Sequence, residues 1–119
     1  MMLEPAKGNK MSIKKSKPTN LFDFLDFIRE KPELYIGEKS LTALYFNING
    51  FNLSCWVHNI EENIKPEWKG FHDFVALKLE YTESTSGYRN MILEKNQFDE
   101  IKSLNMFFEL VDSYKETYK

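Results

Sequence analysis

Cys55 and His58 are the first pair of residues whose types could support chemistry. They lie three positions apart, so on a helix they share a face, where thiol and imidazole can make a thiolate nucleophile or half of a zinc site. Zinc needs further ligands, and the sequence offers one other histidine, His72, and no second cysteine. Cys55 also falls on a predicted buried stripe, where cysteine behaves as a small hydrophobic residue. We therefore interpret Cys55 as a packing residue and predict no metal site and no catalytic residue.

His72 and Asp73 form a second pair, because an imidazole oriented by a carboxylate can act as a general base. Adjacent residues on a helix point about 100° apart, so the spacing alone does not bring the two side chains together. Asp73 is also explained by its place near a helix start, where a carboxylate interacts favourably with the helix dipole. A small enzyme that combines His72 with Glu80 or Glu83 in a cleft is one alternative function.

Further carboxylates in the carboxyl-terminal half stand at helical spacing. Glu80 and Glu83 could share one face, as could Glu109 and Asp112. Two carboxylates perform acid–base chemistry only when their surroundings separate their pKa values, and nothing in the sequence indicates such burial. We interpret these groups as a solvated face or as part of a partner-binding surface.

Residues 80–88 combine hydroxyls, carboxylates and aromatic rings in one predicted turn. Aromatic residues such as tyrosine are enriched where proteins bind one another. The segment equally fits a capped connection, in which Thr85 or Ser86 begins the next helix and Tyr81 enters the core. Trp68, in a polar loop, is either a lid on the core or an interface anchor. The predicted partner-binding residues are Trp68, His72, Asp73, Glu80, Glu83, Ser84, Thr85, Ser86 and Tyr88.

The composition indicates one folded domain. A chain of 119 residues is near the usual domain size, and an apolar fraction of 42% is too high for a disordered chain. No apolar run approaches the ~20 residues that span a bilayer, and no signal-peptide core is evident, so we expect a cytoplasmic protein. The sequence contains no P-loop or dinucleotide-binding glycine pattern, and we predict no cofactor.

Charge divides the chain into two parts. Residues 1–18 hold five lysines and one glutamate, a net charge of +4, which leaves −6 for residues 19–119 of a chain whose total is −2. We predict a flexible basic leader over residues 1–18 and a single helical domain over residues 19–119. An acidic body suits a basic partner and argues against nucleic acid as the main ligand. A nucleic-acid accessory protein that uses the leader is a second alternative.

The sequence of the amino-terminal half predicts two helices. Asn20 caps the first, which ends before Pro32 because a residue preceding proline disfavours helical geometry. Residues 33–37 are expected to form a short connector. Ser40 caps the second helix, and Gly50 within it is expected to allow close packing of another backbone. The expected buried stripe of this helix is Leu41, Leu44, Ile48, Phe51 and Cys55.

The carboxyl-terminal half begins with a polar loop over residues 60–70. Residues 71–81 fit a helix, although apolar residues alternate near 75–81 as in a short strand. We favour the helix, because no neighbouring segment offers a hairpin partner. A last helix is predicted with Asn96 as its cap and a stripe of Ile101, Leu104, Phe108 and Val111. The predicted fold class is therefore mainly all-α, a bundle of four to five helices.

Several short motifs carry a resemblance to a known group. They are the opening Leu21–Gly37 with its Lys-Pro-x-x-Tyr-Ile-Gly end, Ser40–Leu44, Gly50-Phe51, Phe71–Phe74 and Glu83–Tyr88. Together they resemble small bacterial immunity proteins encoded beside polymorphic toxins, including those of contact-dependent growth inhibition systems. The resemblance implies a cytoplasmic, non-enzymatic protein that binds a cognate toxin domain and blocks its active site or substrate surface. Such toxins are often basic nucleases, which an acidic body would suit.

Overall fold

The computed structural model describes residues 18–82 and 86–117, and these residues are all-α. In chain order the elements are α1 (Leu21–Glu30), α2 (Pro32–Ile36), α3 (Leu41–Val57), the short 3₁₀ helix η1 (Trp68–Gly70), α4 (Phe71–Lys78), α5 (Gly87–Lys95) and α6 (Glu100–Glu116). The predicted fold class is confirmed, with more helices than expected. Residues 1–17 of the predicted leader lie outside the described residues.

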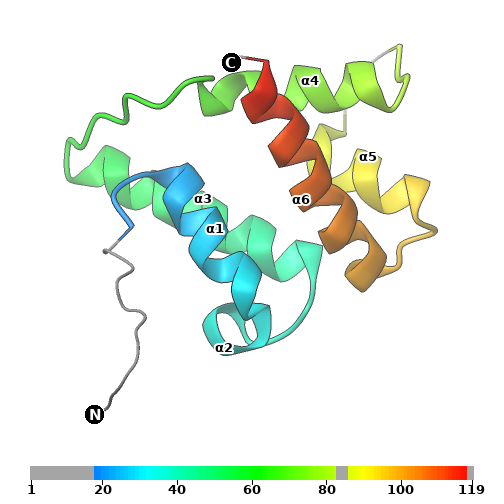
Figure 1. Ribbon diagram of the computed structural model, residues 1–119, viewed down its shortest axis with the longest axis horizontal. Coiled ribbons are helices and arrows are strands. Elements are labelled where there is room, and N and C mark those ends of the chain that lie inside the picture. The colour runs from blue at the N-terminus through cyan, green and yellow to red at the C-terminus, as the bar shows by residue number, and fades with distance from the viewer. Residues whose placement is uncertain (1–17, 83–85, 118–119) are drawn as a thin grey trace.

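α6 occupies the middle of the arrangement. In Figure 1 it runs between the group formed by α1, α2 and α3 and the pair formed by α4 and α5. α3, α4 and α5 each pack against α6, and α4 also packs against α5. The C-terminal half of α3 extends away from α6 toward the edge of the molecule (Figure 1), before the chain returns to η1. None of the helices in the described ranges has the length and hydropathy needed to cross a membrane.

The first two helices begin and end where local chemistry favours it. The Asn20 side chain accepts a hydrogen bond from the Asp23 backbone N–H at 2.9 Å, which confirms the predicted cap. The predicted connector over residues 33–37 is wrong, because Pro32 begins α2. Proline suits the first turn of a helix, where its missing N–H and fixed φ cost nothing. Gly37 ends α2 in the left-handed region, at φ +88°.

α3 begins at its predicted cap, since the Ser40 side chain accepts a hydrogen bond from the Ala43 backbone N–H at 3.0 Å. Its predicted stripe is buried in the first three residues and half-buried in the last two, Phe51 and Cys55. The close packing predicted at Gly50 is wrong. A Cβ at this position would meet nothing within 4 Å, because Gly50 lies on the exposed side of the helix.

Residues 71–78 form helix α4, as predicted, and the alternative strand near 75–81 does not form. The alternation of apolar residues has a different cause. Val75 is fully buried, whereas Leu77 on the other side of the helix is 75% exposed. Beyond the helix the chain turns at Glu80, which has φ +63°, and Tyr81 then packs against the core.

The cap predicted for the last helix is wrong. Asn96 is the C-terminal cap of α5, and Asp99 caps α6 by accepting a hydrogen bond from a backbone N–H three residues later at 2.9 Å. The physical reason is that Gln97 and Phe98 both adopt left-handed φ values, of +53° and +63°, so the chain reverses between the two helices. The predicted stripe of α6 is buried except at Ile101, which is 53% exposed.

Phe71 lies at the centre of the core and is fully buried. Its ring stacks on Trp68 of η1 at 4.6 Å and meets Phe107 and Tyr114 of α6 edge-on, both at 5.5 Å between ring centroids. Tyr88 of α5 approaches the same ring at 5.2 Å. Offset and edge-to-face ring pairs of this kind add to the free energy gained by burial. One side chain therefore joins four elements of the fold.

Tyr114 explains the glycine at position 70. The Tyr114 hydroxyl donates a hydrogen bond to the backbone carbonyl of Glu67, and a Cβ at Gly70 would lie 2.5 Å from that hydroxyl oxygen. The phenol cannot move aside easily, because it is hydrogen-bonded and its ring packs against Phe71 and Phe74. At Gly70 the backbone and the Tyr114 hydroxyl are so close that any side chain would force a shift in the packing.

Glu100 joins the N-terminal ends of α3 and α6. Its carboxylate accepts hydrogen bonds from the Thr42 backbone N–H at 2.8 Å, the Thr42 hydroxyl at 2.6 Å and the Ser40 hydroxyl at 3.1 Å. The Arg89 guanidinium of α5 donates to the same Thr42 hydroxyl at 3.4 Å. Burial raises the pKa of Glu100, but the hydrogen bonds and the charge of Arg89 outweigh it, so the pKa lies below its usual value.

Alanine at the two helix-associated glycines should have opposite effects on stability. We expect Gly50→Ala to raise the free energy of unfolding by about 0.5–1 kcal/mol, because the helix interior gains a better helix former in open space. Gly70→Ala should lower it by roughly 1–3 kcal/mol, because the new methyl group overpacks Tyr114. Urea denaturation of the two variants measures both changes, and a loss of stability in Gly50→Ala would contradict the open environment of that position.

Replacing Glu100 by glutamine should destabilise the protein in a pH-dependent way. Because the pKa of Glu100 is depressed in the folded protein, its charge stabilises fully above the unfolded pKa of about 4.3, and this contribution is lost as the pH falls through the folded pKa. We expect Glu100→Gln to cost roughly 1–2 kcal/mol at pH 7 and much less at pH 3. Unfolding curves at both pH values test this, and an equal cost at both would exclude a role for the charge.

Candidate protein-binding surface

α3 is a helix of 17 residues that contains no Asp, Glu, Lys or Arg. One side packs into the core, but the other side leaves large apolar side chains between 56% and 76% exposed. These residues, together called the α3 face, are Phe46, Leu53, Trp56, Val57 and, just beyond the helix, Ile60. Large apolar side chains gathered on the exposed side of a helix are typical of a surface that contacts another molecule. The exposed side of α3 is therefore a candidate contact surface.

Helical spacing makes part of the α3 face a continuous stripe. Phe46, Gly50, Leu53 and Val57 follow one another at intervals of four, three and four residues, which places them on one side of the helix. A shallow hollow of about 470 Å³ lies at Gly50 and is bordered by three phenylalanine side chains, with Asn47 and Ser54 also on its lining. Single exposed apolar residues are common on protein surfaces, whereas a contiguous apolar patch marks an interaction site.

A cleft of about 480 Å³ lies beside the α3 face, between the C-terminal part of α3 and residues 60–69. We call it the tryptophan cleft. Its apolar walls are Trp56, Ile60, Ile64 and Trp68, and its polar lining is Asn52, Cys55, Glu62, Glu67 and Lys69. Because Trp56 and Ile60 belong to both, the cleft and the α3 face form one continuous surface.

Trp68 in the tryptophan cleft is held in place by the rest of the fold. It stacks on Phe71 with an interplanar angle of 13° and meets Phe22 edge-on at 6.2 Å, so its ring is fixed by the core. Burial raises the pKa of the Glu62 carboxyl in the same cleft, and the backbone N–H of Leu21 offsets only part of this effect.

Cys55 and His58 do not form a nucleophilic pair. Cys55 is half-buried in the lining of the tryptophan cleft, and His58 is exposed at the C-terminal cap of α3. Burial, followed by the negative charge of Glu62, raises the pKa of the Cys55 thiol, so it stays protonated near neutral pH. Within residues 18–82 and 86–117, no three His, Cys, Asp or Glu side chains cluster as metal ligands would.

Trp68 and Tyr88 are predicted partner-binding residues that also take part in the core. The sequence predicts Trp68 to be either a lid on the core or an interface anchor. It covers Phe71 as a lid would, and its remaining surface lines the tryptophan cleft. Tyr88 packs among Trp68, Phe71 and Phe107, and its buried hydroxyl has no hydrogen-bond partner among the described residues. Burial raises the pKa of Tyr88. Tyr88 therefore supports Trp68 from within the core.

Among the other predicted partner-binding residues that the structure describes, His72 and Asp73 are separated from Glu80 by the length of α4. His72 and Asp73 lie in the first turn of α4, and Glu80 lies beyond its last turn, so the helix separates their backbones by about 10 Å. Ser86 occupies the N-terminal cap position of α5 but makes no side-chain capping hydrogen bond. Glu83, Ser84 and Thr85 lie outside the described residues.

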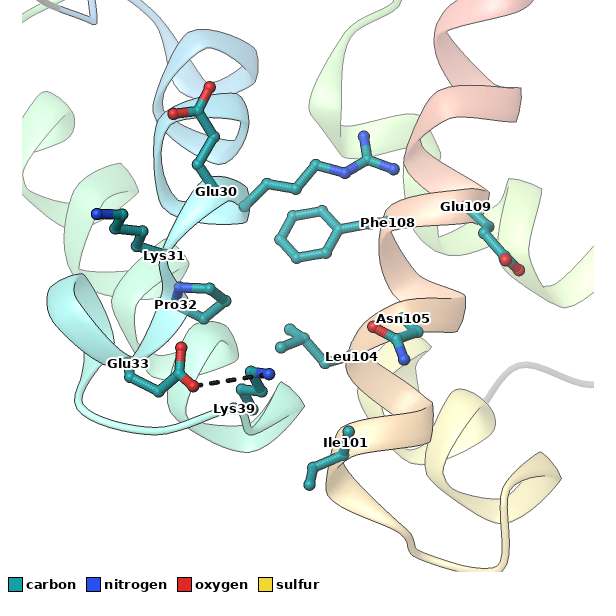
Figure 2. Close-up of a pocket in the computed structure, with 11 residues that line it drawn as sticks. Glu30, Lys31, Pro32, Glu33, Lys39, Ile101, Leu104, Asn105, Phe108 and Glu109 are labelled. Atoms are coloured by element: carbon teal, nitrogen blue, oxygen red, sulfur yellow. Dashed lines mark ion pairs between the residues drawn. The ribbon is translucent and has the colours of Figure 1, made fainter.

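Another pocket, of about 570 Å³, lies between the α1–α2 turn and α6. Figure 2 shows Phe108 and Leu104 of α6 facing Pro32 across it. Its lining carries three acidic and three basic side chains, and Glu33 and Lys39 among them form an ion pair at 3.6 Å. This balanced charge favours neither an anionic nor a cationic ligand. The α3 face and the tryptophan cleft are the stronger candidate site.

The sequence interpretation missed the α3 face, although a signal was present. Residues 41–57 lack charge, and Phe46, Leu53 and Trp56 place large apolar groups opposite the predicted stripe. A helix with more apolar surface than one core-facing side requires either a larger core or an external partner. Comparisons with protein-family models, curated proteins and solved structures found no match to this chain. The described residues therefore define an all-α protein with an exposed apolar surface on α3.

Replacing Glu62 by glutamine should make Cys55 more reactive. Loss of the negative charge lowers the thiol pKa and so raises the thiolate fraction at a given pH. We expect alkylation by iodoacetamide at pH 8 to accelerate by less than about tenfold, because burial, the larger cause of the shift, remains. Mass spectrometry of timed samples measures the rate. Glu61→Gln, which removes an exposed neighbouring carboxylate, should leave the rate unchanged, and an equal acceleration in both variants would contradict a local effect.

Proposed function

We propose that this protein is a non-enzymatic immunity protein, which binds a cognate toxin domain through the α3 face and the tryptophan cleft. The observation that carries the proposal is the exposure of five large apolar side chains on and beside an uncharged helix. Desolvating such side chains against a partner stabilises a complex, and aromatic residues are frequent among those that dominate binding. The resemblance of the short sequence motifs to bacterial immunity proteins points to the same role, in the cytoplasm.

Charge supports a basic partner. Residues 19–119 carry a net charge of −6, and the segment 60–69 beside the α3 face holds Glu61, Glu62 and Glu67 against Lys65 and Lys69, a local net charge of −1. Complementary charge accelerates association and disfavours wrong partners. A nuclease toxin presents a basic surface to phosphate, so a protein docked there would block its substrate. The apolar α3 face supplies affinity and the acidic surroundings supply orientation.

The enzyme alternative receives less support. A general base must reach its proton within about 3 Å, whereas α4 separates the backbones of His72 and Glu80. The nucleic-acid alternative depends on lysines of the leader at positions 7, 10, 14, 15 and 17, which lie outside the described residues. The acidic charge of residues 19–119 would oppose phosphate binding by the rest of the chain.

The binding surface can be located with single substitutions. The molecule tested as partner is the purified product of any toxin-like gene found next to the one that encodes this chain, and calorimetry gives the dissociation constant. We expect Leu53→Ser and Trp56→Ala each to weaken binding by at least about tenfold, as for apolar residues at the centre of an interface. Leu77→Ala is the matched control, because Leu77 is equally exposed on α4 and should change affinity less than about twofold.

Two results would contradict this assignment. If Glu80→Ala weakens binding while Leu53→Ser does not, the partner docks on the 80–88 turn instead of the α3 face. If no neighbouring product binds and sedimentation shows a dimer that Trp56→Ala dissociates, the α3 face joins two copies of this chain. Either result is separated from unfolding by circular dichroism, since Leu53 and Trp56 are 60% and 76% exposed and their replacement leaves the core intact.

A further inference from the structure

We propose that the tryptophan cleft is an acceptor site for an arginine side chain of the partner, which names the chemistry recognised at the surface assigned above and rests on that assignment. The cleft combines apolar walls with a carboxylate on its lining. Trp56, Ile60, Ile64 and Trp68 supply the apolar part, and Glu62 supplies the charge. A cleft of about 480 Å³ is in the size range of sites that enclose small ligands.

The apolar walls suit the stem and the planar head of arginine. Three methylene groups of the arginine stem can be covered by Ile60 and Ile64 while the guanidinium reaches the tryptophan rings. Guanidinium groups stack on indole faces and are more weakly hydrated than ammonium groups. Trp68 is already fixed by its stack on Phe71, so one wall of the site is ordered before binding.

The acidic lining suits the positive charge. The Glu62 carboxylate lies on the lining of the cleft, and its two oxygens can accept a bidentate guanidinium contact. Glu67 lies on the same cleft and pairs with Lys69 at 3.3 Å, but Lys69 is 86% exposed and can turn away into solvent. Glu62 is less exposed than Glu61 and Glu67, so its charge is less screened by water.

Other occupants satisfy this lining less well. A purely apolar group would cover Glu62 and leave its charge without a partner, which is strongly unfavourable. An anionic group would be repelled by Glu62 and Glu67. A lysine ammonium is a compact point charge that lacks the planar face with which a guanidinium stacks on an indole ring. The structure therefore favours arginine over these alternatives.

The test uses N-acetyl-arginine amide as the probe, with the isosteric but uncharged N-acetyl-citrulline amide as its control. The chain contains two tryptophans, so two indole N–H signals in a ¹H–¹⁵N spectrum of the full chain report on the cleft, and Trp56→Phe assigns them. We expect both signals to shift saturably with the arginine probe and to remain nearly unchanged with the citrulline probe.

Matched variants separate the cleft from general attraction between charges. Glu62→Gln should weaken the arginine probe by about tenfold, as expected for loss of a charge-assisted hydrogen bond. Glu61→Gln makes the same change of net charge outside the cleft and should weaken it by less than about twofold. Trp56→Ala removes an exposed wall without touching the core, so it should also weaken the probe, even if Glu62→Gln alters the start of α1.

The outcomes distinguish the cleft from the proposed function. Absence of indole shifts, equal shifts with citrulline, or equal weakening by Glu61→Gln and Glu62→Gln would each overturn the arginine site. If the toxin binds and Leu53→Ser weakens it while the arginine probe gives no shift, only the cleft assignment fails. If the probe binds as expected but no toxin binds, the arginine site stands and the immunity function fails.

Discussion

The packing of aromatic rings around Phe71 is the interaction on which the rest of the structure depends. Phe71 is fully buried, and its ring contacts Trp68, Tyr88, Phe107 and Tyr114. α4 and α5 contain only eight and nine residues, and helices of this length are unstable in isolation. Their stability must come from tertiary contacts. A single aromatic cluster therefore holds η1, α4, α5 and α6 together.

The same cluster prepares the surface proposed to bind a partner. Trp68 is part of the core through its stack on Phe71 and part of the tryptophan cleft through its remaining surface. Ile64, another wall of the cleft, is buried in the hydrophobic core. The cleft is thus ordered by the fold itself, and a partner that enters it loses less free energy to the ordering of side chains.

The α3 face reflects the limited size of the core. A chain of this length buries roughly two thirds of the surface exposed by its unfolded form. One side of α3 uses that core, and the Glu100 network fixes its N-terminal end to α6. The remaining side, with Phe46, Leu53 and Trp56, has no element of the described structure to cover it. This uncovered side is the surface that the proposed partner would bury.

The sequence by itself determined the all-α class, the caps at Asn20 and Ser40 and most of the buried stripe of α6, because these depend on residues within a few positions of one another. Only the tertiary structure decided which glycine is crowded. Gly70 meets Tyr114, 44 positions away, whereas Gly50 meets nothing. It also decided that Asp99 and not Asn96 caps α6, and that α3 keeps one apolar side exposed. The physical reason is that burial and close approach arise from contacts between distant segments, and a local pattern states which residues are apolar but not which of them the fold covers.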